Sequence, residues 1–462
     1  MTNTATAVLQ AIDAYQDTIL AAERHIWNNP ETGYKEWKTH AYLKEQFEAL
    51  GYTVTEAGNI PGFWADIDTG RPGPCVAVFG EMDCLVVPSH PERDPETGNV
   101  HACGHNCQCA GLLGVAAGLK APGALDALSG RIRLIAVPAE EGIELSWRRQ
   151  LMEQGIIHYI AGKQEFMYRG ILDGVDMAMM VHTGGKGLSI GKGGNGCVVK
   201  EAVFCGKSAH AGGSPQLGLN ALYAANGAIL AANTLRETFK DNDHIRFHPI
   251  ITQGGAAVNA IPDRVAVESY VRGASMDAII RENGKINRAF AGMAAGMGCG
   301  VQLWDHHGYA PCLYDPTFKG LLYDVGCEIM GEDKMFFSEN WAMGCSDIGD
   351  VCCVMPTIQP SIAGCVGSAH SKDFFITDPV TACVTSAKIQ CALLVRLLEN
   401  GAAEALRVLG ENTCKYPSIP EYLAQTRQLC IDRQAVTFHA DGSVGLSFGP
   451  PTPEDTEIPT PV

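Results

Sequence analysis

The segment Cys75-Val76-Ala77-Val78-Phe79-Gly80, which continues into Glu81-Met82-Asp83, decides the fold of this chain. The part up to Gly80 is a nearly continuous apolar run, the pattern of a strand that is buried on both faces of a sheet. Further runs of this kind occur at residues 131–138 and 176–181. Helical patterns alternate with these strands, so we expect an α/β fold with a mostly parallel sheet.

Polar side chains follow each of these apolar runs. The carboxyl ends of parallel strands meet at one edge of a sheet, and ligands gather there. We therefore expect the functional site at this edge, where the sequence places Glu81, Asp83, Glu140, Glu141 and His182.

The motif His101-Ala102-Cys103-Gly104-His105 supplies candidate metal ligands. Thiolate and imidazole are ligands that Zn²⁺ prefers, and a glycine between them lets both side chains face one ion. A structural zinc site built from Cys103, Cys107 and Cys109 is the alternative. No second Cys-x-x-Cys pair completes four ligands, so we expect Cys107 and Cys109 to be small buried residues at a helix start.

The composition indicates a folded protein that binds neither nucleic acid nor an anionic membrane surface. The chain has 462 residues, 46% of them hydrophobic and 18% charged, which favours two domains with ordered cores. The formal net charge of −17 argues against nucleic acid and against anionic membrane surfaces, because both attract basic proteins.

The 18 cysteines indicate reduced thiols rather than a disulfide framework, because the chain is long. Its start has no basic region and carries Asp13 within an apolar stretch, so it does not resemble a secretory signal. We also find no run of about 18 uncharged apolar residues, the length that a membrane span needs. The sequence therefore predicts a cytoplasmic location.

The order of elements predicts that one domain is inserted into another. Residues 196–307 read strand, helix, strand, strand, helix and strand, the order of a ferredoxin-like α+β domain. We expect residues 1–195 and 308–448 to be the two segments of the catalytic domain, and the Pro-rich residues 449–462 to be a loose tail. The glycine run at 191–196 lacks the residues of a phosphate loop and is interpreted as a hinge.

In this combination the chain resembles the M20 family of metal-dependent peptidases and amidohydrolases. The resemblance is closest to the D branch, which contains N-acyl-amino-acid and aminobenzoyl-glutamate hydrolases. The motifs that carry it, in family order, are residues 80–83, 101–106, 138–141, 206–211 and 344–347, together with His370.

The resemblance implies a two-metal site with Cys103 at the bridging position. Asp83 would orient a ligand imidazole, and His101 would be structural. Two divalent ions are expected, Mn²⁺ or Zn²⁺, with Co²⁺ or Ni²⁺ as alternatives that availability decides. The implied ligands are Cys103, His105, Glu141, His182 and His370.

The resemblance also implies the remaining roles. Glu140 would be the general base that takes a proton from the metal-bound water and passes it to the leaving nitrogen. Asn259 and Arg272 of the inserted lid domain would hold a substrate carboxylate, and His210 would contact the scissile carbonyl, often from a partner subunit. A homodimer through the lid domain is therefore expected.

We expect the protein to hydrolyse an amide bond in a small carboxylate-bearing molecule, such as a dipeptide, an N-acyl amino acid or an aroyl-glutamate. The alternatives are a catalytically silent metal-binding scaffold of the same fold, and a redox protein that uses Cys103, Cys107 and Cys109. The roles of Asp347 and Asp350 stay open between support of the metal ligands and simple turn formation.

Overall fold

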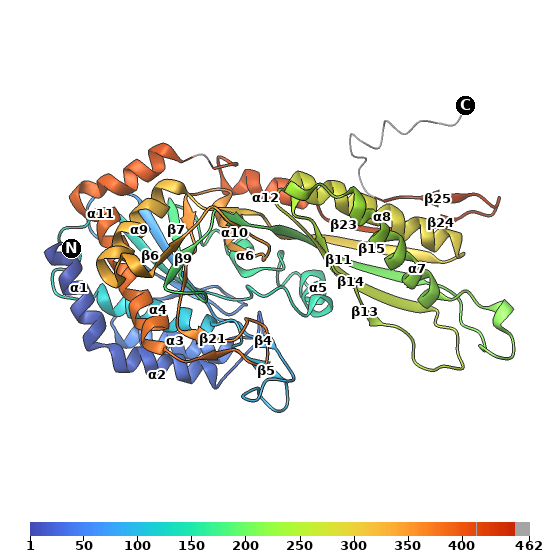
Figure 1. Ribbon diagram of the computed structural model, residues 1–462, viewed down its shortest axis with the longest axis horizontal. Coiled ribbons are helices and arrows are strands. Elements are labelled where there is room, and N and C mark those ends of the chain that lie inside the picture. Colours follow the sequence, from blue (N-terminus) through green and yellow to red (C-terminus); the bar gives the residue numbers. More distant parts are fainter. Residues whose placement is uncertain (413, 449–462) are drawn as a thin grey trace. The chain divides into compact units, whose positions relative to one another are not determined.

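The computed structural model describes residues 1–412 and 414–448, and the chain folds into two compact units (Figure 1). The first unit consists of Met1–Gly193, Cys312–Ala342 and Ser346–Tyr422. The second consists of Gly194–Pro311, Met343–Cys345 and, among the described residues, 423–448.

The first unit is built around a six-stranded sheet in the order β1-β2-β6-β3-β7-β19. Strands β6, β3, β7 and β19 run parallel to one another, while β2 pairs antiparallel with both β6 and β1. Every residue of the central strand β3 is buried, as the apolar run predicts. The α/β fold with a mostly parallel sheet is confirmed. The strands are β1 (Thr55–Glu56), β2 (Phe63–Asp68), β3 (Cys75–Glu81), β6 (Arg131–Val137), β7 (Met177–Met179) and β19 (Thr357–Ile358).

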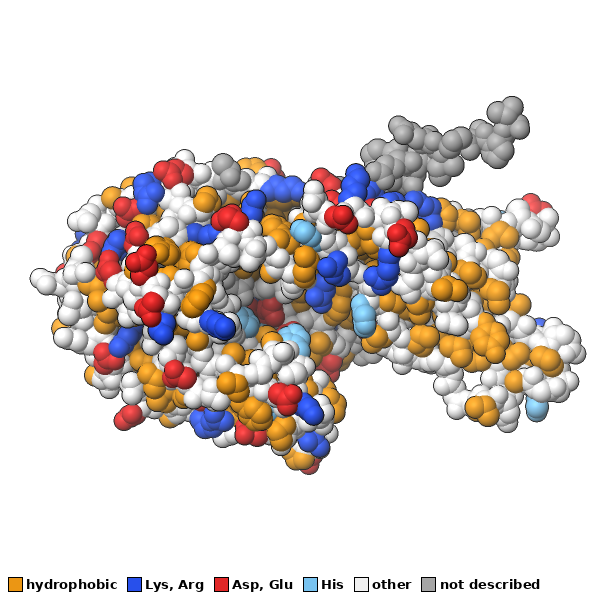
Figure 2. Space-filling view, viewed as in Figure 1, with side chains coloured by type: hydrophobic (Ala, Val, Ile, Leu, Met, Phe, Trp, Pro, Cys, Tyr) orange, Lys and Arg blue, Asp and Glu red, His pale blue; other side chains and the backbone are white. Residues whose placement is uncertain are grey.

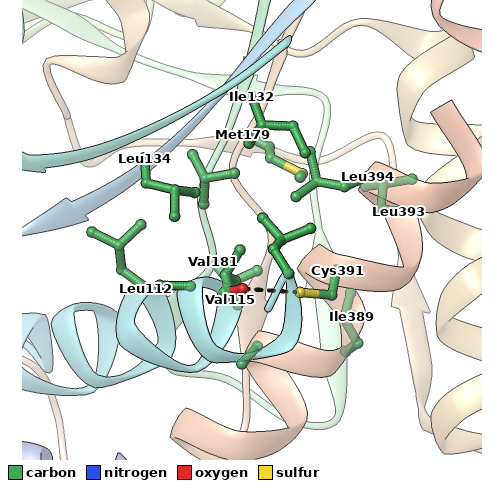
Figure 3. Close-up of a cluster of buried hydrophobic side chains, with 14 of the residues drawn as sticks. Leu112, Val115, Ile132, Leu134, Met179, Val181, Ile389, Cys391, Leu393 and Leu394 are labelled. Atoms are coloured by element: carbon green, nitrogen blue, oxygen red, sulfur yellow. Dashed lines mark hydrogen bonds between the residues drawn. The ribbon is translucent and has the colours of Figure 1, made fainter. Parts of the chain in front are cut away.

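Helix α4 (His105–Gly118) is the central helix of this unit and is buried along its whole length. It packs against β3, α2 and α11. Figure 3 shows Leu112 and Val115 of α4 among side chains of β6, β7 and α11, with the Cys391 thiol 3.6 Å from the main-chain oxygen of Val115. A Cβ atom at Gly114 would lie 2.7 Å from the Cβ of Ala387, so α4 and α11 approach closely because this position lacks a side chain.

The remaining helices of the first unit surround this core. One stretch, Val380–Glu411, is long and apolar enough by composition to cross a bilayer, but 72% of its apolar window is buried inside the protein. It therefore has the character of a core helix. The helices are α1 (Asn3–Ala14), α2 (Gln16–Trp27), α3 (Trp37–Ala49), α5 (Leu145–Glu153), α6 (Gly162–Tyr168), α9 (Pro316–Met330), α10 (Ile348–Cys352) and α11 (Ser386–Glu411), with the π-helix η5 (Val380–Thr385) before α11.

Smaller sheets complete the first unit and the segments where the chain passes between units. A four-stranded sheet has the order β17-β9-β20-β8, and the hairpins β4-β5 and β21-β22 lie apart from it. These strands are β17 (Met335–Phe337), β9 (Leu188–Ile190), β20 (Ser361–Ile362), β8 (His182–Thr183), β4 (Leu85–Val86), β5 (Asn99–Val100), β21 (Cys365–Val366) and β22 (Phe375–Ile376), and short strands near the crossings are β10 (Gly193–Gly194), β16 (Cys312–Leu313) and β18 (Trp341–Ala342).

The second unit is an antiparallel sheet in the order β12-β14-β11-β15-β23, with β13 also paired to β14. Helices α7 and α8 pack against each other and against this sheet. Along the chain the order is the predicted strand, helix, strand, strand, helix, strand, except that the first of the two middle strands is divided into β12 and β13, which both pair with β14. Its elements are β11 (Gly196–Cys205), α7 (Ala221–Thr234), β12 (Arg246–Phe247), β13 (Ile250–Gln253), β14 (Arg264–Gly273), α8 (Met276–Gly296) and β15 (Gly300–Tyr309).

The assignment of residues 308–448 to the catalytic domain is wrong for its last part. Strand β23 (Ile431–Gln434) pairs with β15, from Gln302↔Gln434 to Asp305↔Ile431, so the chain after Tyr422 extends the sheet of the second unit. Helix α12 (Ile419–Arg427) spans this change of unit, and the hairpin β24 (Val436–Phe438) and β25 (Val444–Leu446) follows. The predicted tail at 449–462 lies outside the described residues.

Candidate active site

The turn between Cys103 and His105 depends on Gly104. Gly104 has a φ of 86°, a left-handed conformation that residues with a Cβ rarely adopt, and a Cβ there would lie 2.9 Å from the Cβ of Thr183. The turn places the Cys103 sulfur 3.5 Å from Nε2 of His182, at the start of β8. Cys103, His105 and His182 form one group whose donor atoms all lie within 4.8 Å of one another.

A second donor group shares Cys103. It contains Glu141, which follows strand β6, and His370, whose Nε2 lies 3.2 Å from Oε1 of Glu141. The main-chain N–H of His370 donates to the oxygen of Ala102 at 2.8 Å, which ties this loop to the Cys103 turn. The structure thus brings together all five residues that the sequence analysis named as ligands, and Cys103 belongs to both groups.

The spacing of these atoms fits metal ions. Ligand nitrogen and sulfur atoms about 2.0 and 2.3 Å from one tetrahedral ion are about 3.5 Å apart, as are those of His182 and Cys103. Nε2 of His105 is buried and makes no hydrogen bond. Because an unsatisfied buried polar atom costs about 1–3 kcal/mol, atoms of this kind need a partner, and a cation supplies one.

Hydrogen bonds fix the orientation of the imidazoles. Nδ1 of His105 lies 2.9 Å from the main-chain oxygen of Asp83 and 3.1 Å from its Oδ1, while Nδ1 of His182 lies 2.9 Å from the oxygen of Thr183. These contacts place the ring hydrogen on Nδ1 and leave the Nε2 lone pair for an ion. Oδ2 of Asp83 accepts from the main-chain N–H of Glu141 at 2.8 Å, so one carboxylate connects two candidate ligands.

Glu140 and Glu141 differ in electrostatic environment. Burial raises the pKa of Glu140 well above its usual value, and repulsion from Glu81 and Glu141 raises it further. Burial also raises the pKa of Glu141, but the hydrogen bond and charge of His370 outweigh it, so that pKa is lowered. Glu140 therefore retains its proton more readily, whereas its neighbour Glu141 stays ionised.

The sequence analysis missed a buried ion-pair cluster. The fully buried Lys163 donates hydrogen bonds from Nζ to Glu81 and to Asp347, and its main-chain N–H donates to Oδ2 of Asp347 at 2.9 Å. Asp347 therefore neutralises Lys163, whereas Asp350 accepts a hydrogen bond from Tyr422. A lysine gives no sequence signal for such a position, because lysines almost always lie on the surface.

Cys107 and Cys109 are buried near the start of α4, as predicted, and the alternative zinc site with Cys103 is not formed among the described residues. No donor group there includes Cys107 or Cys109, which both lie on the buried helix α4. The thiol of Cys109 instead donates to the main-chain oxygen of Glu81 at 2.9 Å. All 18 cysteines are free thiols, and burial raises the pKa of Cys109, which disfavours the reactive thiolate.

The three predicted substrate-contacting residues belong to the second unit. Nδ1 of His210 accepts hydrogen bonds from the main-chain N–H groups of Gly212 and Gly213, at 3.1 and 2.9 Å, so the ring hydrogen lies on the exposed Nε2 side. Asn259 lies beside this loop, because its main-chain oxygen accepts from the N–H of Ala211 at 2.9 Å.

Arg272 lies near the end of β14, opposite Cys197 of β11. Its guanidinium is 5.3 Å from the centre of the Tyr270 ring, a cation–π contact.

Comparison with known proteins agrees with this site. The model of Peptidase family M20/M25/M40 matches residues 77–398. Two relatives are 28% identical to this chain: the N-acetyl-L-cysteine deacetylase of Bacillus subtilis over 330 residues (68% of this chain and 73% of that protein), and the mouse Xaa-Arg dipeptidase over 378 residues (76% and 78%).

A solved structure from Bacillus subtilis, a dinuclear metal-binding peptidase of the M20 family, has the same fold. It superimposes with a TM-score of 0.61 at 20% identity and covers 84% of this chain and 99% of that one. The fold and the donor groups define a metal-dependent hydrolase of C–N bonds. The chain belongs to the M20/M25/M40 peptidase family.

Proposed function

We propose that the protein hydrolyses an amide bond in a small molecule with a free carboxylate, such as a dipeptide, an N-acyl amino acid or an aroyl-glutamate. The observation that carries this proposal is the pair of donor groups that share Cys103. The names of the two relatives refer to an N-acetyl amino acid and to a dipeptide, and both belong to this substrate class.

The proposed ligands are Cys103, His105, Glu141, His182 and His370. Two divalent ions bound there supply a water of lowered pKa and polarise the substrate carbonyl. The Cys103 thiolate favours Zn²⁺, whereas the imidazole and carboxylate ligands tolerate Mn²⁺, Co²⁺ or Ni²⁺.

Glu140 moves the proton in this proposal. Its carboxyl group accepts the proton of the attacking water and returns it to the leaving nitrogen. Burial and the charges of Glu81 and Glu141 raise the pKa of Glu140, which makes its carboxylate a stronger proton acceptor. Its Oε2 atom lies 3.9 Å from Nε2 of His105, which places Glu140 beside the donor groups.

The second unit supplies the substrate contacts in this proposal. Arg272 and Asn259 bind the substrate carboxylate, for which the planar guanidinium offers paired N–H donors. His210 donates from Nε2 to the oxygen of the scissile carbonyl as negative charge develops on it. The two main-chain donors at Nδ1 support this assignment, since they fix the tautomer that has its hydrogen on Nε2.

We also propose a homodimer through the second unit. Each residue of strand β13 is exposed, and an edge strand offers unpaired main-chain groups to a second copy. Tyr223 and Leu230 of α7 are 65% and 67% exposed, and apolar side chains gather on this unit in Figure 2. The cytoplasmic location remains a proposal that rests on the cysteine usage of the sequence.

A hydrolysis screen tests the proposed function. Dipeptides, N-acyl amino acids and aroyl-glutamates are offered to the purified protein while its bound metals are quantified. We expect hydrolysis of at least one class, loss of activity with a chelator, and recovery with Zn²⁺ or Mn²⁺. Bound metal without turnover would support the silent scaffold, and chelator-insensitive thiol chemistry would support the redox protein.

A further inference from the structure

Glu81, the last residue of β3, forms a third donor group with His105 and Glu140. Its Oε2 atom lies 3.2 Å from Nε2 of His105. Two ligand atoms about 2.1 Å from one ion, at an angle between 90° and 109°, are about 3.0–3.4 Å apart. The Glu81 carboxylate thus lies where a neighbouring ligand of a His105-bound ion would lie.

The Glu81 side chain is held rigidly in this place. Its Oε1 accepts a hydrogen bond from Lys163, and its Oε2 accepts one from Nε2 of Gln108 at 2.8 Å. The main-chain N–H of Glu81 donates to Oε1 of Gln108 at 3.3 Å, so Gln108 holds both ends of the residue. A carboxylate oxygen has two lone pairs, and Oε2 uses one of them for Gln108.

The charge of Lys163 explains how a carboxylate can be kept at this depth. Glu81, Lys163 and Asp347 are all fully buried. A buried carboxylate without a partner is costly, and the ammonium group neutralises one of the two acids. Asp347 already pairs with Lys163. The charge of Lys163 therefore does not by itself explain why a second carboxylate, that of Glu81, lies beside His105.

We propose that Glu81 is a further metal ligand, on the same ion that His105 binds. This inference rests on the proposed two-metal function. The Nε2 atom of a neutral imidazole has one lone pair and binds one ion. Glu81 therefore adds an oxygen to the ion that His105 binds, and does not create a third metal position. A carboxylate oxygen beside an imidazole makes this position more tolerant of Mn²⁺.

Glu81 and Asp347 offer a matched pair of variants. Glu81→Gln and Asp347→Asn each remove one negative charge from Lys163 without a change of shape, but only Glu81 lies at His105. The metal-free proteins are titrated with Co²⁺, and binding is followed by calorimetry and by the visible absorption of the bound ion. We expect Glu81→Gln to weaken one of the two ions about tenfold or more and to change its spectrum. Asp347→Asn should change neither by more than about threefold.

Equal effects of the two variants, or wild-type binding by Glu81→Gln, would overturn the inference while the two-metal function stands. If Glu81→Gln does not fold, Glu81→Asp replaces it. That variant keeps the charge beside Lys163 but withdraws the oxygen from His105. It should weaken the same ion by a similar factor, and wild-type affinity would overturn the inference. A wild-type protein that binds no ion would contradict the proposed function itself.

Discussion

The guanidinium of Arg148 donates a hydrogen bond to the main-chain oxygen of Glu141, and Arg148 is fully buried. A second hydrogen bond, 2.8 Å long, joins it to the oxygen of Ile160. Arg148 lies on α5, in the segment that follows the Glu140–Glu141 pair. The buried Arg148 side chain therefore supports the turn that contains Glu140 and Glu141.

We predict that Arg148→Met lowers both stability and activity. The buried oxygen of Glu141 loses its donor, which costs about 1–3 kcal/mol of unfolding free energy. Thermal unfolding and kcat/KM measure the two effects. Arg149→Met is the control, because the neighbouring Arg149 makes a partly exposed ion pair with Glu153 that is worth less than about 1 kcal/mol. Similar losses in both variants would argue against a special role of Arg148.

Glu140→Gln tests the general base. We expect turnover to fall by at least about 10²-fold, the lower range for general acid–base catalysis, while both metal ions remain bound. Steady-state kinetics and metal analysis of the same preparation provide the two readings. A near-normal rate, or loss of metal together with activity, would contradict the role assigned to Glu140.

Gly104→Ala tests the turn between Cys103 and His105. A left-handed residue with a Cβ costs about 1–2 kcal/mol, and at Gly104 the added atom also meets Thr183 at 2.9 Å. The variant should unfold at lower temperature and bind the His105 ion more weakly. Gly70→Ala is the matched control, since Gly70 has a φ of 71° but nothing within 4 Å of the added Cβ. Equal metal affinity in the two variants would show that the turn does not depend on Gly104.

Arg272→Ala tests carboxylate recognition. We expect KM to rise most for substrates with a free carboxylate and to change little for their esters or amides, because those lack the charge that Arg272 binds. Arg264→Ala, at the exposed start of the same strand, is the control and should leave KM unchanged. An equal loss on charged and uncharged analogues would remove this role from Arg272.

The sequence predicts those parts of the molecule whose signals are local. The apolar runs mark β3, β6 and β7, and the motif resemblance names ligands that the fold brings together, although they are far apart along the chain. Helix α4 begins at His105, and its full length has no sequence signal because a helix buried on all sides shows no amphipathic period. The first of the two strands predicted between the helices of the second unit is divided into β12 and β13 around Pro249, which has no N–H for the ladder.

Other features depend on contacts between distant segments. Strand β23 has only four residues, and nothing in their sequence indicates that they pair with β15. For this reason the last part of the chain is predicted in the wrong unit. The burial of Lys163 depends on Glu81 and Asp347, which come from separate parts of the sequence. Glu81 was recognised as a residue at the sheet edge, but its approach to His105 depends on the orientation of both side chains.

The most direct test of the account is the position of the metal ions relative to Cys103. Crystals of the protein loaded with Zn²⁺ or Mn²⁺, measured at the absorption edge of the metal, locate the ions without assumptions about the ligands. We predict two ions about 3.5–4 Å apart, both in contact with the Cys103 sulfur. A single ion, or ions that do not contact Cys103, would contradict the central claim.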